Sequence, residues 1–322
     1  MTENWEVVVV GGGAAGLSAA LVLGRARRRT LVVDAGEPRN APSAHMQGYL
    51  TRDGMSPAEF LARGREEIAR YGVELVRDRA VDASGDATGF TVELASGRSV
   101  RARQLVIATG LTDELPAVPG LAERFGRDVV HCPYCHGWEL RDLPTGVLAT
   151  SPLSAHQALM VTQWSKDVRL FLHEVSESEL TADDLRRLAA AGVTPVPGRV
   201  EELVVADDRL AGVRLADGTV HEREVLYAAP RAVPRNDLLV RLGAELRETP
   251  FGAYPVTDER GLTTVPGVWA AGNVGGFAEQ VVNAAGRGYR AGAAINAELL
   301  FADLDATARV QSPATRRPAP AR

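Results

Sequence analysis

The chain has 322 residues and a formal net charge of −5, with 45% hydrophobic and 24% charged residues. This length suffices for two domains of ordinary size, and this balance of residues is typical of a globular protein. The negative net charge, with no long basic run apart from residues 25–29, argues against a nucleic-acid or anionic-membrane partner.

The N-terminus and the apolar runs bear on the location of the protein. Residues 1–10 lack a basic region followed by an apolar segment and a small-residue cleavage site. No apolar run approaches the roughly 18 residues that a helix needs to cross a bilayer. We therefore expect a cytoplasmic protein without a membrane partner.

The first elements form a βαβ pattern. Residues 5–10 are rich in valine and alternate little, as expected of a parallel strand buried on both faces. A glycine-rich turn over 11–16 leads into a helical pattern that reaches about Leu23, and a second strand over 30–33 ends at Asp34.

Further α/β elements follow in two groups. The first group is a hairpin over 91–94 and 98–100 and a buried strand over 104–108. After a proline-containing linker at 116–119, a second group alternates strands and helices over 147–150, 154–164, 168–172 and 181–191. A turn at Asp217-Gly218 indicates another hairpin.

The last segment predicts the domain organisation. A strand over 268–271, a glycine turn over 272–276 and a helix from about 279 to 300 follow a return linker at 230–234, without a nucleotide fingerprint of their own. We therefore expect an α/β fold of two Rossmann-like domains. Residues 1–116 and 235–304 form the first domain, residues 117–234 form a smaller inserted one, and the tail 305–322, rich in Pro, Ala and Arg, is disordered.

A dinucleotide fingerprint, G-x-G-x-x-G, lies between the first strand and helix at Gly11, Gly13 and Gly16. The first glycine permits the tight turn, the second lets the backbone approach a pyrophosphate, and the third allows close packing of helix and strand. Asp34, at the end of the second strand, is suited to a ribose hydroxyl. The alternative is an ordinary glycine turn. FAD is favoured over NAD because the motif opens the chain and a cysteine-bearing half follows.

Two cysteines, Cys132 and Cys135, form a C-x-x-C pair flanked by His131 and His136. Such a pair closes a disulfide across one short turn, and nearby cations or a helix N-terminus stabilise its thiolates. Either histidine is suited to hold a proton as thiolate forms. The pair therefore predicts redox chemistry.

Three other interpretations of the pair were considered. C-x-x-C-H also matches c-type haem attachment, which normally follows export, but the chain has no export signal. A zinc site needs four ligands, and the remaining histidines are isolated, so we expect no metal. Simple buried thiols are the third interpretation.

Taken together, these residues resemble the low-molecular-weight thioredoxin reductase family over residues 5–302. The matching segments are 11–16, 108–110, the C-x-x-C pair, 265–273 and 280–286. The resemblance implies a homodimer and an FAD-binding domain interrupted by a smaller NAD(P)-binding-like domain. The FAD contacts expected from the motifs and the resemblance are Gly11, Gly13, Ala14, Ala15, Gly16, Asp34, Thr109, Gly110, Gly272, Asn273, Gln280 and Val281.

The same resemblance implies roles for the residues around the cysteines. Cys135 would lie against the flavin C4a, and Cys132 would attack the substrate disulfide or dithiol. His136 replaces the aspartate that usually acts as proton donor. Asn273 replaces a flavin-contacting aspartate and retains one hydrogen bond to the ribityl or phosphate region.

The second nucleotide motif of the family is altered here. Its glycine positions correspond to Ala149, Ser151 and Ser154, and Pro152 removes a donor N–H. Residues 171–174 replace the arginines that meet the 2′-phosphate of NADPH, and Glu174 would repel that phosphate. The sequence therefore argues against NADPH binding.

The stretch 131–139 looks closer to the gliotoxin- and holomycin-type dithiol oxidases of the same superfamily. We therefore predict oxidation of a small dithiol or a thioredoxin-like protein, with FAD as cofactor and oxygen as acceptor. Three alternatives remain open: an NADPH-dependent thioredoxin reductase, a reductase served by ferredoxin or another flavoprotein, and a non-catalytic flavin sensor.

Overall fold

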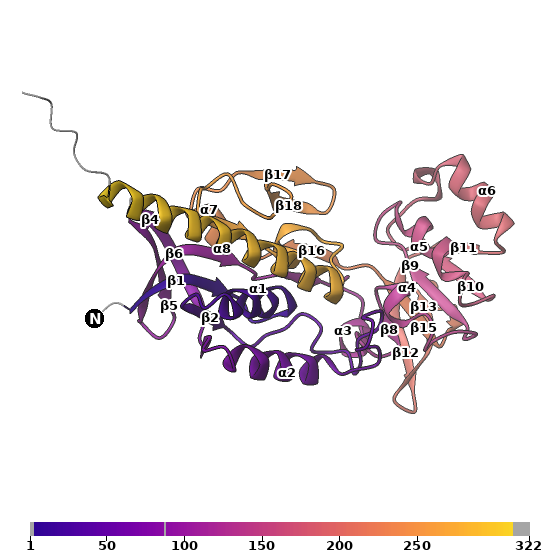
Figure 1. Ribbon diagram of the computed structural model, residues 1–322. Coiled ribbons are helices and arrows are strands. Elements are labelled where there is room, and N and C mark those ends of the chain that lie inside the picture. Colours follow the sequence, from indigo (N-terminus) through magenta and orange to yellow (C-terminus); the bar gives the residue numbers. More distant parts are fainter. Residues whose placement is uncertain (1–2, 87, 312–322) are drawn as a thin grey trace, which may run out of the picture.

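The protein is described by a computed structural model of residues 3–86 and 88–311. Figure 1 shows a larger lobe formed by the two ends of the chain and a smaller lobe formed by its middle. Each lobe is built on its own mainly parallel sheet. The α/β fold class predicted from the sequence is confirmed.

The larger lobe holds a seven-stranded sheet. Six strands follow the order β3-β2-β1-β6-β5-β4, and β19 pairs with the C-terminal end of β6. Its strands are β1 (Glu3–Val10), β2 (Thr30–Asp34), β3 (Glu74–Arg77), β4 (Ala80–Asp86), β5 (Gly89–Leu94), β6 (Ser99–Ile107) and β19 (Val268–Ala270). The predicted strands at 98–100 and 104–108 are one strand, β6, because no turn residue separates them. Since β19 lies beside β6, the last segment does rejoin the first sheet.

The valine run of β1 is buried on both faces, as its sequence predicts. Val7 and Val9 pack with Leu17, Leu23 and Ile295 from the helices, whereas Val8 and Val10 belong to a separate core on the opposite face. The helices of this lobe are α1 (Ala14–Arg25), α2 (Pro57–Ala69), α7 (Asp237–Arg241), the 3₁₀ turn η2 (Gly272–Gly275) and α8 (Val281–Gln311).

The smaller lobe holds a five-stranded parallel sheet in the order β11-β10-β9-β15-β8. Its strands are β8 (Val129–Val130), β9 (Thr145–Leu148), β10 (Val168–Phe171), β11 (Thr194–Val196) and β15 (Val225–Ala228). Its helices are α3 (Leu121–Arg124), α4 (Pro133–His136), α5 (Ser154–Val161), η1 (Glu177–Glu179) and α6 (Ala182–Ala190). An antiparallel sheet of β12 (Val200–Ala206), β13 (Arg209–Leu215) and β14 (Val220–Glu222) adjoins it, and the predicted Asp217-Gly218 turn joins β13 to β14.

The chain passes between the lobes twice, and the two passages lie side by side. β7 (Leu111–Glu114) pairs antiparallel with β16 (Arg231–Pro234). The hydroxyl of Thr109 donates to the carbonyl of Arg235 at 2.6 Å, and the Arg235 N–H donates to the Gly110 carbonyl at 3.0 Å. The predicted linker at 116–119 thus follows β7, and the predicted linker at 230–234 contains β16. The domain boundaries at 116/117 and 234/235 stay predictions. A hairpin of β17 (Leu246–Thr249) and β18 (Gly252–Pro255) follows the second passage.

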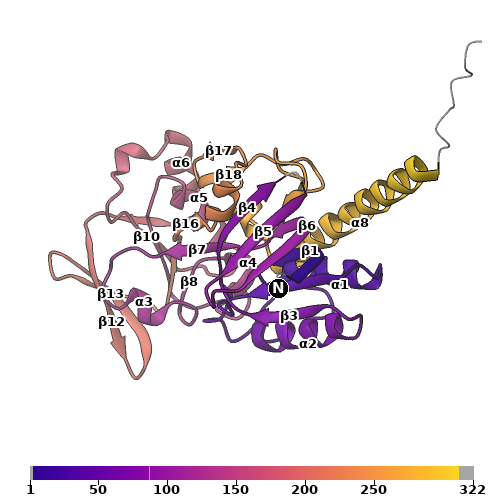
Figure 2. The ribbon, with the colours of Figure 1, turned by 90° about the vertical axis from the view of Figure 1, so that its left-hand side faces the viewer.

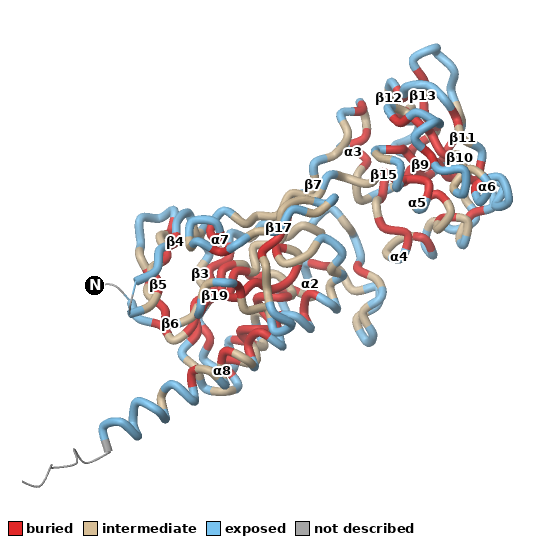
Figure 3. The backbone as a smooth tube through the Cα atoms, turned by 90° about the horizontal axis from the view of Figure 1, so that it is seen from above, coloured by how far each residue is buried: buried red, intermediate tan, exposed pale blue. Residues whose placement is uncertain are grey.

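The end of the chain differs from the prediction. The last helix, α8, continues to Gln311, although a helix to about 300 and disorder from 305 were expected. Residues 305–311 include Ala, Arg and Gln, which are good helix formers, and the first proline comes only at position 313. Figures 2 and 3 show this exposed end of α8 projecting from the lobe. Residues 312–322 lie outside the described part. Among the described helices, none has both the length and the apolar character that crossing a membrane requires.

Glycines allow α1 and α8 to pack closely, and this generates a test. A Cβ at Gly288 would lie 1.9 Å from the Ala15 carbonyl oxygen, so Gly288→Ala must push the helices apart. We expect it to destabilise the fold by about 1–3 kcal/mol. Gly286→Ala, with no atom within 4 Å of its Cβ, is the matched control and should be neutral or stabilise by up to about 1 kcal/mol. Thermal unfolding compares the two variants, and equal melting temperatures would contradict the assigned packing.

Candidate functional site

One large cavity, of about 1900 Å³, is lined by residues of both lobes. Ligand pockets usually have volumes of about 300–1,000 Å³, so this cavity has room for an extended cofactor and a substrate. It is lined by every residue predicted for the site except Gly16: Gly11, Gly13, Ala14, Ala15, Asp34, Thr109, Gly110, Cys132, Cys135, His136, Gly272, Asn273, Gln280 and Val281.

The glycines of the fingerprint serve two different purposes. Gly11 has a φ of +109°, and a Cβ there would lie 2.3 Å from the Ala108 carbonyl oxygen. A Cβ at Gly16 would lie 1.8 Å from the Gly11 carbonyl oxygen, so the fold itself requires both glycines. A Cβ at Gly13, by contrast, would meet no protein atom within 4 Å.

Gly13 is also the N-cap of α1, and no side chain caps that helix. The N–H groups of the first turn are therefore available to a ligand, and the helix dipole favours an anion there. The open space at Gly13 and this uncapped helix fit the pyrophosphate of FAD.

Asp34, expected at the ribose, is buried beside the same turn. Its Oδ1 accepts hydrogen bonds from the N–H groups of Gly12 and Gly36, each at 3.2 Å. Its Oδ2 faces Arg77 at 3.1 Å and Arg65 at 3.4 Å. Asp34 therefore organises the turn after β2 as well as lining the cavity, and its contact with ribose stays a prediction.

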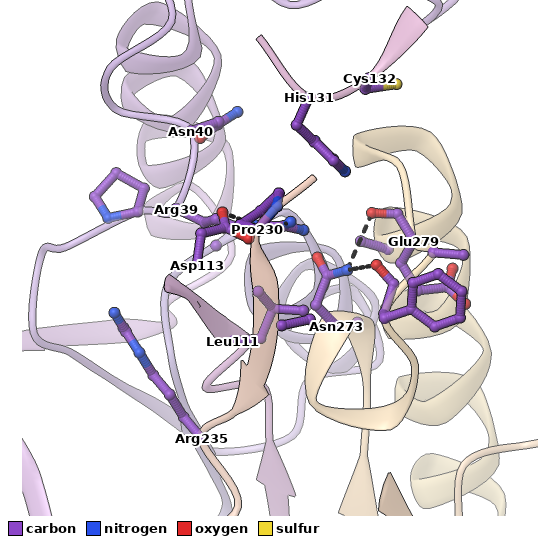
Figure 4. A pocket seen from close by; sticks show the side chains of 18 of the residues that line it. Arg39, Asn40, Leu111, Asp113, His131, Cys132, Pro230, Arg235, Asn273 and Glu279 are labelled. Atoms are coloured by element: carbon purple, nitrogen blue, oxygen red, sulfur yellow. Dashed lines mark hydrogen bonds and ion pairs between the residues drawn. The ribbon is translucent and has the colours of Figure 1, made fainter. Parts of the chain in front are cut away.

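The second predicted cofactor segment is shaped by Asn273. Its Nδ2 donates to the carbonyls of Gly276, Phe277 and Glu279 at 3.1–3.3 Å. Figure 4 shows two of these bonds. An ionised aspartate has no hydrogen to donate and would repel these carbonyls. The amide group is thus what this loop conformation needs, a role beyond the single cofactor contact predicted from the sequence.

The cysteine pair of the smaller lobe reaches the larger lobe at this segment. Cys132 is the N-cap of the short helix α4, with Pro133 at its first position. Cys132 is buried and Cys135 is partly exposed. The Cys135 Sγ lies 3.2 Å from Oε1 of Gln280, and Nε2 of Gln280 lies 3.3 Å from the Cys132 Sγ. Which sulfur faces the substrate stays a prediction.

The pKa values of the two cysteine thiols are shifted in opposite directions. The pKa of Cys132 is lowered, first because its sulfur accepts a hydrogen bond from the Cys135 thiol, and further by bonds from Gln280 and from backbone N–H groups. The pKa of Cys135 is raised, because its proton is held in that same bond and because the thiol is buried. Cys132, the residue expected to be the nucleophile, is therefore the sulfur that more readily carries negative charge.

Both flanking histidines line the cavity in the neutral form at pH 7. Burial, together with the nearby Arg39 guanidinium, lowers the pKa of His131 to about 4. Burial also lowers the pKa of His136, whose Nδ1 has no hydrogen-bond partner in the described residues. An imidazole that is neutral at pH 7 has a free ring nitrogen, so His136 is suited to relay the proton of a thiol rather than to keep it.

An ion pair that the sequence did not predict lies in the same cavity. Arg39 forms a two-pronged contact with Asp113, with both N–O distances at 2.7 Å. Figure 4 shows this pair in the same pocket as His131 and Asn273. The two residues are 74 positions apart. Only the place of Arg39 in the loop after Asp34 hinted at a role.

In the altered nucleotide turn of the smaller lobe, polar groups form hydrogen bonds with other groups of the protein. The Ser154 hydroxyl accepts the Thr150 N–H at 3.1 Å, and the Ser154 N–H donates to the Ser151 carbonyl at 3.0 Å. After β10, His173 Nδ1 accepts the Val200 N–H at 3.0 Å, and Glu174 lines the cavity. Donors that a pyrophosphate would need are thus already bonded, which agrees with the doubt about NADPH.

The open space at Gly13 gives a direct test of the cofactor site. Gly13→Ala leaves the protein packing untouched but places a methyl group where the pyrophosphate is expected. We expect FAD affinity to fall at least about tenfold, with an unchanged far-UV circular dichroism spectrum. Titration of the apoprotein with FAD measures this, and Ser178→Ala, on η1 outside the cavity, serves as control. Unchanged affinity in Gly13→Ala would refute the assignment.

Comparisons with known proteins agree with this geometry. The family model described as "Pyridine nucleotide-disulphide oxidoreductase" matches residues 5–288. "Thioredoxin reductase sirT" of Leptosphaeria maculans is 31% identical over 95% of this chain and 98% of its own. "Thioredoxin reductase tcpT" of Claviceps purpurea is 34% identical over 93% and 95%, respectively. The crystal structure of HlmI is 49% identical, with a TM-score of 0.90 over 96% of this chain and 98% of that one.

The resemblance predicted from the sequence is confirmed by these matches, and with it the FAD cofactor. The chain belongs to the pyridine nucleotide-disulphide oxidoreductase family, and it is a thioredoxin-reductase-like, FAD-dependent redox enzyme.

Proposed function

We propose that this enzyme oxidises a dithiol to a disulfide at Cys132 and Cys135, with FAD as the internal acceptor and oxygen as the final one. The observation that carries the proposal is a contrast between two sites. The cysteine pair contacts Gln280 in the predicted flavin segment, whereas the nucleotide turn of the smaller lobe has bonded its donors internally.

The proposed reaction is a two-electron oxidation of the substrate dithiol by the disulfide of the cysteine pair. A substrate thiolate attacks the Cys132–Cys135 disulfide, breaks the S–S bond and forms a mixed disulfide. The second substrate thiol displaces the enzyme sulfur, which yields the substrate disulfide and two enzyme thiols. FAD, when bound, supplies an acceptor for these two electrons that oxygen regenerates, with hydrogen peroxide as product. The imidazole of His136, which lines the cavity and is neutral at pH 7, is placed to relay to solvent the protons that the thiols release.

Aromatic side chains favour a small apolar dithiol as substrate. Phe251 and Phe277 stack with ring centres 3.9 Å apart, and both line the cavity. Tyr134, between the two cysteines, also lines it and is 71% exposed. Aromatic surface of this kind provides apolar contact area for a compact ligand. A thioredoxin-like protein is the alternative substrate.

Oxygen uptake tests the proposal. With dithiothreitol in air, the FAD-loaded enzyme should consume oxygen catalytically and release peroxide, and Cys132→Ser and Cys135→Ser should reduce the rate to background. The matched control Ser178→Ala, a hydroxyl on η1 outside the cavity, should keep the full rate.

An anaerobic comparison of reductants separates the alternatives. Rapid flavin reduction by NADPH, with no oxygen uptake from dithiol, would overturn the proposal in favour of an NADPH-dependent reductase. A single stoichiometric reduction by dithiol without turnover would instead indicate a sensor.

We further propose that the enzyme is a homodimer assembled through α8. The resemblance to thioredoxin reductases implies a dimer, and α8 carries exposed apolar side chains opposite its buried face. Val282, Tyr289, Leu300 and Leu304 follow helical spacing along that exposed face and are 40–60% exposed. Such a stripe is typical of a surface that another protein covers.

Charge placed on this stripe tests the dimer. The double variant Leu300→Glu and Leu304→Glu should shift the sedimentation coefficient from dimer to monomer, because carboxylates resist burial in an apolar interface. Val205→Glu, a comparably exposed apolar position on β12 of the smaller lobe, should remain dimeric. A monomeric wild-type protein, or a dimeric double variant, would refute the interface.

A further inference from the structure

We propose that Gln280 is a positioning residue that adds to the inequality of the two sulfurs, chiefly by stabilising the negative charge on Cys132. Its expected contact with FAD does not account for this side chain, whose oxygen and nitrogen are both turned to the cysteines. The inference deepens the proposed function, on which it rests for the meaning of the two sulfurs.

The two ends of an amide have opposite hydrogen-bonding roles. An amide oxygen only accepts hydrogen bonds, and an amide nitrogen only donates them. Oε1 lies 3.2 Å from the Cys135 Sγ, where it can only accept the single thiol hydrogen of Cys135, which is shared with the Cys132 sulfur. Nε2 lies 3.3 Å from the Cys132 Sγ, so that sulfur accepts, and a hydrogen bond to a thiolate stabilises the charged form. This side chain thus adds to the division of charge that the hydrogen bond from the Cys135 thiol to the Cys132 sulfur sets up.

Besides the Cys135 thiol, the backbone N–H groups of Tyr134 and Cys135 also favour charge on Cys132, but the neighbouring ionisable side chains do not. His131 and His136 are partly buried and neutral at pH 7, and the pKa of the buried Tyr227 is raised, so its phenol keeps its proton. Arg39, the charged group that acts on Cys135, is already paired with Asp113. Within the described chain, Gln280 is the one side chain besides the cysteines themselves that hydrogen-bonds either sulfur.

Gln280 and the two cysteines lie in different lobes, so their hydrogen bonds depend on how the lobes meet. Gln280 directly precedes α8 in the larger lobe, whereas the cysteines belong to the smaller lobe. Its backbone carbonyl accepts the Ala284 N–H at 2.8 Å, which anchors it to the first turn of α8. The contribution of Gln280 to the division of charge therefore exists only while the cysteine pair is in contact with the predicted flavin segment.

The pH dependence of alkylation measures the division. The reduced, FAD-loaded enzyme is treated anaerobically with iodoacetamide, and mass spectrometry of the peptides reports Cys132 and Cys135 separately. In the wild type, Cys132 should react first, with a midpoint below the value of about 8.5 of an ordinary thiol. In Gln280→Leu, this midpoint should rise by roughly one pH unit or more, because the bond to the thiolate is lost.

Two further variants sharpen the result. Gln280→Glu removes the donor and adds a negative charge, so its Cys132 midpoint should rise further than that of Gln280→Leu. Gln163→Leu, which removes an exposed amide of the smaller lobe, should keep the wild-type midpoint. FAD absorbance and circular dichroism verify that each variant is loaded and folded; if Gln280→Leu does not fold, Gln280→Glu and the wild type still decide.

The inference is overturned if Cys135 is the faster-reacting residue in the wild type, or if both Gln280 variants keep the wild-type midpoint. The assay uses neither oxygen nor a dithiol substrate. Failure of oxygen uptake with an intact reactivity difference would therefore reject the proposed function and retain the role of Gln280. Normal oxygen uptake with equal reactivities would do the reverse.

Discussion

The proposed chemistry of this enzyme depends on one contact between its two lobes, the hydrogen bonds that join Gln280 to Cys132 and Cys135. The cysteines lie at a short helix at the edge of the smaller sheet, and Gln280 directly precedes the long helix of the larger lobe. The paired strands β7 and β16, which carry the chain out and back, connect the lobes. Each lobe thus provides one part of the candidate site, the smaller lobe the cysteine pair and the larger lobe Gln280.

The two nucleotide-type turns show how similar folds acquire different capacities. At the first turn, Gly11 and Gly16 are required by contacts within the protein, and Gly13 leaves space and donors for a ligand. At the second, Ser154 bonds back to Thr150 and consumes a donor. Both turns follow an inner, parallel-paired strand of their sheet, so the two turns differ in local hydrogen bonding rather than in architecture.

Much of the fold could be predicted because its signals are local. The valine run, the glycine turn and the following helix lie within about one βαβ unit and read directly as strand, turn and helix. The predicted bounds of two elements, β6 and α8, differ from the structure because tertiary packing sets where these elements begin and end. β6 was divided into two strands because its outer half alternates in burial and its inner half is wholly buried. The end of α8 was placed too early because helix formers without an apolar pattern resemble a disordered tail.

By itself, the sequence determined the chemistry-bearing groups: the fingerprint glycines, the cysteine pair with its histidines, and the altered second turn. It did so because each is a short motif whose spacing has a physical meaning. Only the tertiary structure decided their partners. The Arg39–Asp113 pair spans 74 positions, and Gln280 meets cysteines 145 and 148 positions away. The role of Asn273 likewise depended on the conformation of the loop it stabilises. Contacts across such separations follow from how the lobes pack, and no local pattern records them.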